Sequence, residues 1–298
     1  MSESITLADV AVVICTYRSQ LEIAEALQSC LASGFEPAQV TVIDNFSDDG
    51  TADLVAREFP QVRLIRLQQN LGFAAANNRA ATDLGGSTLL LLNPDAVLVG
   101  NAAQVMVEAL AEDPQRGAIS PRIDRPDGRL DAACRRTFPT PLIAFWRLVG
   151  LSRLRPNNPR FGAYNLTHVA VDQAMEIDSG SGACLLIRRT VWDQLQGFDA
   201  KFFMYGEDLD LCWRMYDRGF IVWYQPAARV VHRKGQSSRQ DALAMLVAFH
   251  RSMWRFYRLH YLRGRNALWS PLVALGILAR LSCLLLLNAL RRNPTVSP

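Results

Sequence analysis

Three acidic residues, Glu207, Asp208 and Asp210, crowd the predicted start of a helix. A carboxylate held there by backbone N–H groups can act as a well-oriented general base, and like-charged neighbours raise the pKa of one member of such a group. Helix capping is the alternative, because the macrodipole favours acids in the first turn and Asp210 can pair with Arg214 one turn later. The segment is therefore a candidate for proton transfer.

An amide and a carboxylate, Asn93 and Asp95, lie two residues apart directly after the apolar run Leu89–Leu92. Divalent cations bound to a diphosphate prefer hard oxygen ligands of this kind, and the diphosphate would supply much of the coordination. His232 ends another apolar stretch and could add a neutral imidazole. Asn-Pro-Asp is also a common turn, and a lone histidine is more often structural. The position of Asp95 after a buried strand nevertheless favours a metal site.

Polar groups also follow the apolar runs Val10–Cys15 and Val40–Ile43, where two predicted strands end. These groups suit a nucleoside, because an aspartate can accept a hydrogen bond from a pyrimidine imide N–H and an aromatic ring can cover the base. For the second segment, an Asx-turn with a helix cap is the alternative. The residues that offer these groups are Thr16, Tyr17, Arg18, Asp44, Asn45 and Asp48.

Small residues dominate the segment from Gln69 to Arg79, which follows a third predicted strand and starts a helix. Small side chains let a ligand approach the backbone closely, and a helix N-terminus favours phosphate. Tight packing of the helix against a sheet through alanine is the alternative, and both can hold at once.

Short apolar strands that alternate with amphipathic helices position these segments. This alternation predicts an α/β fold with a mostly parallel central sheet covered on both faces, in which ligands bind outside the carboxyl ends of the strands. The predicted strands are Val10–Cys15, Val40–Ile43, Val62–Arg66 and Leu89–Leu92, and the predicted helices are Ser19–Leu31, opened by a Ser19/Glu22 capping box, Thr51–Glu58 and Ala74–Thr82.

The periodicity weakens between Arg122 and Thr167, where prolines indicate irregular connections or an excursion on the acceptor side. It returns with a strand over Ala183–Ile187, a short helix from Thr190, and a helix over Glu207–Arg218.

Composition limits the possible functions. The 298 residues are 50% hydrophobic, as in a globular protein, and the net charge of +4 is too mild for a nucleic-acid-binding chain. The six cysteines form no C-x-x-C pair, and the first residues lack the features of a secretion signal, so we expect a cytoplasmic protein. P-loop and H-E-x-x-H motifs are absent, which disfavours a P-loop ATPase.

The C-terminal region, residues 241–298, differs from the preceding 240 residues. Leu268–Leu290 is apolar but contains Pro271, Gly276 and Arg280, and we interpret it as an interfacial or re-entrant helix pair. An arginine-rich stretch precedes it and Arg291 and Arg292 follow it, as expected beside an anionic membrane surface. We expect docking on the inner face of the cell membrane; packing on the globular core is the alternative.

The ordered motifs resemble the family 2 glycosyltransferases with the GT-A fold, and especially their rhamnosyltransferase-like branch. The resemblance implies an inverting transfer of a deoxyhexose such as rhamnose from a dTDP- or UDP-sugar to a polyprenyl-linked or polysaccharide acceptor. The matching stretches, which extend from Val10 to His232, are VVICTYRS, VIDNFSDDGT, NLGFAAANN, LLLNPDA, SGSGACLLIRR, GFDAKFFMYGEDLDLCWR and VVH.

The resemblance also implies roles for single residues. Asp208 matches the catalytic base, and Glu207 would orient it or the acceptor. The implied nucleoside contacts are Thr16, Asp44 and Asp48, the diphosphate contacts are Asn70, Gly72 and Asn78, and Asn93, Asp95 and His232 belong to the site of Mg²⁺ or Mn²⁺.

Two other functions remain open at this point. A nucleotidyltransferase shares this architecture and metal chemistry, but it usually has a glycine- and lysine-rich loop where this chain has Thr16-Tyr17-Arg18-Ser19. A non-catalytic, membrane-bound nucleotide-sugar binder is the second alternative.

Overall fold

A computed structural model describes residues 5–233, 242–262 and 264–290. Arg263, Arg291 and Arg292 of the predicted basic regions lie outside these described residues. The chain forms one nine-stranded sheet in the order β3-β2-β1-β4-β8-β6-β9-β5, with β7 paired to β9. The strands are β1 (Val10–Thr16), β2 (Val40–Asp44), β3 (Arg63–Arg66), β4 (Thr88–Leu92), β5 (Ala96–Val99), β6 (Arg116–Asp124), β7 (Met175–Ile177), β8 (Cys184–Arg188) and β9 (Ile221–His232).

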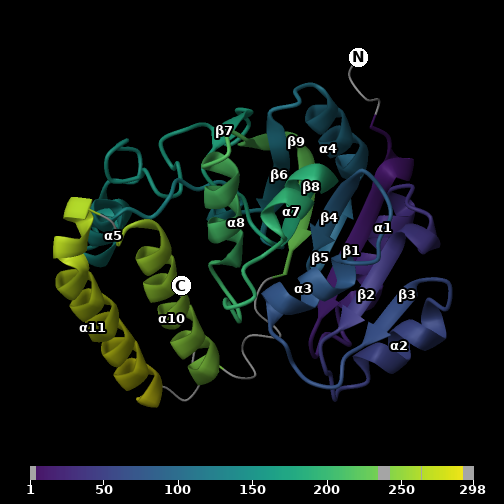
Figure 1. The fold of residues 1–298 in the computed structure, drawn as a ribbon, viewed down its shortest axis with the longest axis horizontal. Helices are drawn as coiled ribbons and strands as arrows, with labels where there is room; N and C mark the ends of the chain where they lie inside the picture. The colour runs from purple at the N-terminus through teal and green to yellow at the C-terminus, as the bar shows by residue number, and fades with distance from the viewer. Residues whose placement is uncertain (1–4, 234–241, 263, 291–298) are drawn as a thin grey trace.

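Helices surround this sheet, and two more lie to one side of it (Figure 1). Every residue of β1, β2 and β4 is buried, so both faces of the sheet are covered there. The helices are α1 (Ile23–Ala32), α2 (Thr51–Glu58), α3 (Phe73–Ala81), α4 (Ala102–Ala111), α5 (Pro141–Leu148), α6 (Leu151–Leu154), α7 (Arg189–Leu195), α8 (Glu207–Tyr216), α10 (Ala242–His260) and α11 (Ser270–Ala289).

The first half of the sheet is the predicted parallel α/β unit. Strand β1 pairs in parallel with β2 on one side and with β4 on the other, and β2 pairs in parallel with β3. Apolar β-branched and leucine side chains predominate in β1, β2 and β4, because a strand buried on both faces has no solvent-facing side, whereas β3 at the edge exposes Arg63 and Arg66. The parallel register brings the carboxyl ends of β1, β2 and β4 to one edge.

The second half of the sheet is mixed. Strand β8 runs antiparallel to β4 and β6, and β5 runs antiparallel to β9, whereas β6 and β9 are parallel. The β8 reversal places the loop before β8 beside the end of β4, because Cys184 pairs with Leu92. Side chains that follow β4 and side chains near residue 182 therefore meet.

Two local predictions are wrong. The capping box of Ser19 and Glu22 does not form: α1 starts at Ile23, and the Ser19 hydroxyl donates to the Tyr17 carbonyl instead. Arg18, the residue before this segment, has a positive φ of 49°. The stretch from Arg122 to Thr167 also contains regular structure, since it includes α5 and α6.

The C-terminal region forms two long helices. Helix α10 packs against α8 through ring contacts of Trp213 with Phe256 and His260, and α11 lies beside α10 on the side away from the sheet (Figure 1). The predicted helix pair over Leu268–Leu290 is wrong, because α11 is one continuous helix. Pro271 falls in its first turn, where a missing N–H costs nothing.

Helix α11 is long and apolar enough to cross a membrane. The candidate span covers Ala267–Ala289, 23 residues with a mean hydropathy of 2.1, and 6% of its most apolar window is buried. Length and composition alone support this statement, because a helix of about 20 apolar residues matches the hydrocarbon thickness of a bilayer.

Candidate active site

The ends of β1 and β2 place two buried oxygen atoms side by side. Thr16 is the last residue of β1 and pairs with Asp44, the last residue of β2. Asp44 Oδ2 accepts a hydrogen bond from the Ser47 amide at 3.0 Å, but Asp44 Oδ1 and Thr16 Oγ1 have no hydrogen-bond partner among the described residues. Buried polar atoms are normally paired, so these two are candidates to bind a polar ligand.

Arg18 and Asp48 pair with each other at the outer rim of this strand edge. Arg18 Nε and Nη2 donate to the two carboxylate oxygens of Asp48 at 2.6 and 2.7 Å, and the guanidinium lies 5.3 Å from the centre of the Tyr17 ring. The hydrogen bonds from Arg18 hold the pKa of Asp48 below its usual value. Asp48 is exposed and already carries a bidentate partner, unlike Asp44.

Asn45 and Asn70 hold the loop that precedes α3. Asn45 Nδ2 donates to Asn70 Oδ1 at 3.0 Å, and Asn45 Oδ1 accepts from the Leu71 amide. Gly72 has a φ of +81°, and a Cβ atom there would lie 2.4 Å from the Phe203 carbonyl oxygen. These contacts give Gly72 a packing role, because only glycine allows Phe203 to approach this closely.

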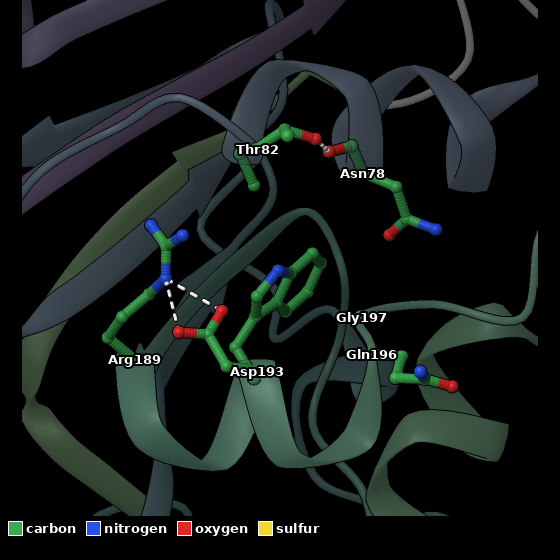
Figure 2. A pocket seen from close by; sticks show the side chains of 8 residues that line it. Asn78, Thr82, Arg189, Asp193, Gln196 and Gly197 are labelled. Atoms are coloured by element: carbon green, nitrogen blue, oxygen red, sulfur yellow. Dashed lines mark hydrogen bonds and ion pairs between the residues drawn. The ribbon is translucent and has the colours of Figure 1, made fainter.

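Asn78 does not join the other candidate residues. Its side-chain oxygen accepts from the Phe198 amide at 2.9 Å and its nitrogen donates to the Phe198 carbonyl at 2.8 Å. Figure 2 shows Asn78 in a pocket with Arg189 and Asp193, beside α7. Helix α7 starts where Arg188 pairs with Thr88, the first residue of β4, so this pocket lies at the opposite end of the sheet from Asp44. Asn78 therefore fastens α3 to the loop that follows α7.

Asn93, Asp95 and His232 come together after β4 and β9. His232 Nε2 lies 3.0 Å from Asp95 Oδ1 and 3.4 Å from Asn93 Nδ2, and its Nδ1 lies 3.5 Å from Asp131 Oδ2. Burial alone would lower the pKa of His232, but the carboxylates of Asp131 and Asp95 outweigh it and raise the pKa to about 9. Asp131 has no counterpart in the sequence-based prediction, because no local pattern marks it.

These residues fit a divalent cation that a diphosphate also coordinates. Asn93 Oδ1 is buried without a partner among the described residues, and Asp95 supplies a hard carboxylate oxygen. The described part of the chain holds no group of three or more His, Cys, Asp or Glu residues that could bind a metal by themselves. His232 bonds to Asp95 in this arrangement, and it would have to lose its proton to bind a metal.

Asp208 lies in the first turn of α8, opposite Arg136. Arg136 Nη2 donates to Asp208 Oδ2 at 2.7 Å, and the Gly182 amide donates to the same oxygen at 3.2 Å. Asp208 Oδ1 accepts from the Leu209 amide. Burial opposes the charge of Arg136, but the negative charge of Asp208, Tyr164 and the hydrogen bond to Asp208 hold the pKa of Arg136 above its usual value. The Asp208 carboxylate is thus fixed in orientation by one charged and two backbone donors.

Glu207 is buried beside Asp208 and has a different environment. Its Oε2 has no hydrogen-bond partner among the described residues. Burial, and then the charge of Asp208, raise the pKa of Glu207 to about 8. Two neighbouring carboxyl groups with unequal environments are the arrangement in which one holds a proton while the other stays ionised.

A two-residue bridge joins the two parts of the site. The Gly182 amide bonds to Asp208, and the Ala183 carbonyl accepts from the Asn93 amide at 2.8 Å. The structure therefore brings Asp208 and Glu207 to the same strand edge as Asn93, Asp95 and His232. Gly182 lies in one of the stretches that carry the family resemblance, but nothing in that stretch identifies Asp208 as its partner, and Arg136 lies in a stretch with no local pattern.

The C-terminal helix α10 supports the same part of α8. Asp210 is buried, and its carboxylate accepts from Arg214 Nε at 2.7 Å and lies 2.9 Å from His260 Nε2. His260 comes from α10, so a residue of the C-terminal region contacts the helix that carries Asp208.

Comparisons with known proteins point to one enzyme family. The model of the family described as "Glycosyltransferase like family 2" matches residues 8–248. An N-acetylglucosaminyl-diphospho-decaprenol L-rhamnosyltransferase from Mycobacterium tuberculosis is 32% identical over 297 residues, 95% of this chain and 94% of that protein. A poly-beta-1,6-N-acetyl-D-glucosamine synthase from Staphylococcus aureus is 24% identical over 74% of this chain and 49% of its own length.

The fold is also similar to that of a solved structure. A mannosyltransferase from Pyrobaculum calidifontis in complex with GDP-Man and Mn2+ has a TM-score of 0.59 and 18% sequence identity, and the match covers 92% of this chain and 74% of that one. At this identity the likeness concerns the fold alone, and it confirms the expected GT-A-like architecture.

Proposed function

The chain belongs to glycosyltransferase family 2, and we propose that it transfers a deoxyhexose such as rhamnose from a dTDP- or UDP-sugar to a polyprenyl-linked acceptor. Membership of this family favours a sugar-transferring enzyme over a nucleotidyltransferase or a non-catalytic nucleotide-sugar binder. The sugar and the acceptor rest on the rhamnosyltransferase relative, which matches this chain over nearly its full length. A polysaccharide acceptor is the alternative that the synthase relative favours.

The observation that carries this proposal is the Gly182–Ala183 bridge. It holds a fixed carboxylate, Asp208, next to the strand edge where Asp44 and Thr16 present unpaired buried oxygens. An inverting transfer needs one base at the acceptor hydroxyl and a separate place for the departing nucleoside diphosphate. The two sides of the bridge supply these two places.

Each residue then has one task. Asp208 accepts the proton of the acceptor hydroxyl as the hydroxyl oxygen attacks the anomeric carbon. Thr16 and Asp44 bind the nucleoside, and Asn93 and Asp95 face the diphosphate. A bound Mg²⁺ or Mn²⁺ would neutralise charge on the leaving diphosphate, and Asn93, Asp95 and a deprotonated His232 would hold it.

The proposed location follows from the C-terminal region. Helix α11 is apolar and largely exposed, and a prenyl-linked acceptor resides in a membrane. We therefore place the protein in the cytoplasm, at the inner face of the cell membrane, where nucleotide sugars are available.

A donor panel tests the proposal. The full chain is incubated with several nucleotide sugars, membrane extract, and Mg²⁺ or Mn²⁺, and release of nucleoside diphosphate is measured. We expect release with a dTDP- or UDP-deoxyhexose that requires both extract and metal, and that stops when a chelator is added. Acceptor-dependent sugar transfer would be contradicted if none of the nucleotide sugars yields nucleoside diphosphate, or if the same amount is released without extract.

A further inference from the structure

Helices α5 and α6 present an apolar surface that no prediction from the sequence included. Several large apolar side chains of this surface are exposed to solvent, and Leu154 is 76% exposed. Figure 1 shows α5 next to the upper end of the α10 and α11 pair, and α11 exposes apolar side chains of its own, among them Leu272 and Leu275. The exposed apolar residues of the two short helices are Leu142, Phe145, Leu148, Val149 and Leu154.

Two arginines lie within this apolar surface. Arg147 and Arg153 are exposed, and neither has an acidic partner among the described residues. The Arg147 guanidinium lies 4.4 Å from the centre of the Tyr164 ring, which holds its orientation. Partial desolvation lowers the pKa of Arg147, and the nearby charges of Arg136 and Arg153 lower it further. Arg280 of α11 also lies within electrostatic range of Arg147 and Arg153.

A short series of contacts connects Arg147 with Arg136, the residue that bonds to Asp208. Arg136 bonds to Asp208, and the next residue, Thr137, donates its amide hydrogen to the Tyr164 carbonyl at 2.9 Å. The Tyr164 ring then contacts Arg147. Arg147 therefore lies one aromatic residue beyond the arginine that holds Asp208.

Arg147 and Arg153 repel each other beside an apolar surface, and an anion bound there would offset their charge. Arginine binds phosphate oxygens through paired, charge-assisted hydrogen bonds, and apolar side chains bind a hydrocarbon chain. A prenyl diphosphate combines these two chemistries in one molecule. Anionic lipid headgroups share these two chemistries, and the vesicle measurement below distinguishes them from a prenyl diphosphate.

We propose that Arg147 and Arg153, assisted by Arg280, bind the diphosphate of the prenyl-linked acceptor, while the leucines of α5, α6 and α11 contact its prenyl chain. The inference rests on the proposed function, and it names where the acceptor's lipid end lies. The diphosphate on these arginines would direct the attached sugar past Tyr164 toward Asp208. Arg147 and Arg153 are acceptor-binding residues in this account and take no proton.

Direct binding tests this site without requiring sugar transfer. The full chain in neutral detergent micelles is titrated with farnesyl diphosphate and with farnesol, and the affinity is measured by calorimetry. Three proteins are compared: the unaltered chain, the double variant Arg147→Gln/Arg153→Gln, and the control Arg155→Gln, which removes an exposed charge from the same segment.

We expect the double variant to bind farnesyl diphosphate about tenfold or more weakly and to bind farnesol as the unaltered chain does, because charged hydrogen bonds of this kind contribute about tenfold each. The control should behave like the unaltered chain. Equal affinity of the double variant for farnesyl diphosphate, or an equal loss in Arg155→Gln, would overturn the proposal.

Two further measurements separate the remaining explanations. Binding of dTDP and UDP to each protein shows whether the variants are folded, and failure of the unaltered chain to bind either nucleotide contradicts the proposed function but not the arginine site. Flotation with phosphatidylglycerol and phosphatidylcholine vesicles tests the headgroup alternative. A double variant that loses phosphatidylglycerol vesicles but keeps farnesyl diphosphate would overturn the proposal in favour of a general membrane surface.

Discussion

The donor side of the site, formed by the ends of β1, β2 and β4, and the acceptor side, formed by Asp208 with its partners, are positioned by different interactions. Parallel backbone pairing fixes Thr16 beside Asp44 on the donor side. Asp208 depends instead on side-chain and loop contacts from Arg136, 72 residues away, and from Gly182, 26 residues away. The donor side is thus specified by the sheet, and the acceptor side by a buried ion pair.

This difference implies that the two sides can be damaged separately. A substitution on the acceptor side should reduce transfer while nucleotide binding persists, because the β1, β2 and β4 ladders do not involve Arg136 or α8. Residues that touch both sides should affect both properties.

Asp208→Asn gives the sharpest separation. The amide cannot accept the acceptor's proton, so transfer should fall roughly 10²- to 10⁴-fold, while the dissociation constant for the donor nucleotide stays the same. Turnover and nucleotide affinity are measured on the same preparation. Asp193→Asn, which alters an exposed acid paired with Arg189, is the matched control and should keep full transfer. Unchanged transfer by Asp208→Asn would remove this residue from the mechanism.

Arg136→Gln tests whether the acceptor side depends on its ion pair. The change leaves a buried carboxylate without its cation, and we expect the free energy of unfolding in urea to fall by about 3 kcal/mol or more. Arg136→Lys keeps the charge but loses the planar guanidinium, so it should lose less. If the two variants are equally stable, the ion pair does not hold Asp208 in place.

Gly72→Ala tests the close contact between the loop before α3 and Phe203. The added Cβ would lie 2.4 Å from the Phe203 carbonyl oxygen, and the φ of +81° is strained for alanine. We expect a loss of about 2 kcal/mol in the free energy of unfolding. Gly85→Ala is the control, because a Cβ there meets no atom within 4 Å. Equal stability of the two variants would show that this contact does not matter.

Glu207 should make stability depend on pH. Burial raises its pKa in the folded chain to about 8 from the ordinary 4.5, so the unfolded chain loses this proton first. The contribution of Glu207 to stability therefore falls as pH rises from about 4.5 to about 8, with a slope of at most about 1.4 kcal/mol per pH unit, and is constant above that range. Urea unfolding at several pH values measures it. Glu207→Gln should flatten the curve, and an unaltered slope would assign it to other groups.

The same contrast explains what could be predicted from the sequence. Strand β2 and helix α2 lie where expected, because strand hydrophobicity and helix periodicity are local patterns. Ser19 does not cap the helix, because its hydroxyl donates to the Tyr17 carbonyl and Glu22 is the residue that precedes the first helical position. Arg136 could not be predicted, since its role depends on a carboxylate 72 residues away.

Two features of the C-terminal helices could not be predicted from the sequence. Pro271 and Gly276 suggested a broken segment, yet a proline in the first turn and a glycine with open space around it leave α11 continuous. The contact of His260 with Asp210 could not be inferred either, because nothing in the sequence of α10 identifies its partner helix.

We propose that one carboxylate, Asp208, serves a single displacement at the anomeric carbon. The anomeric configuration of the product tests this role, by nuclear magnetic resonance of the sugar linkage formed from a donor of known configuration. Inversion is expected, because the acceptor hydroxyl attacks opposite the leaving diphosphate. Retention of configuration would contradict it, since a double displacement needs a second nucleophile on the enzyme.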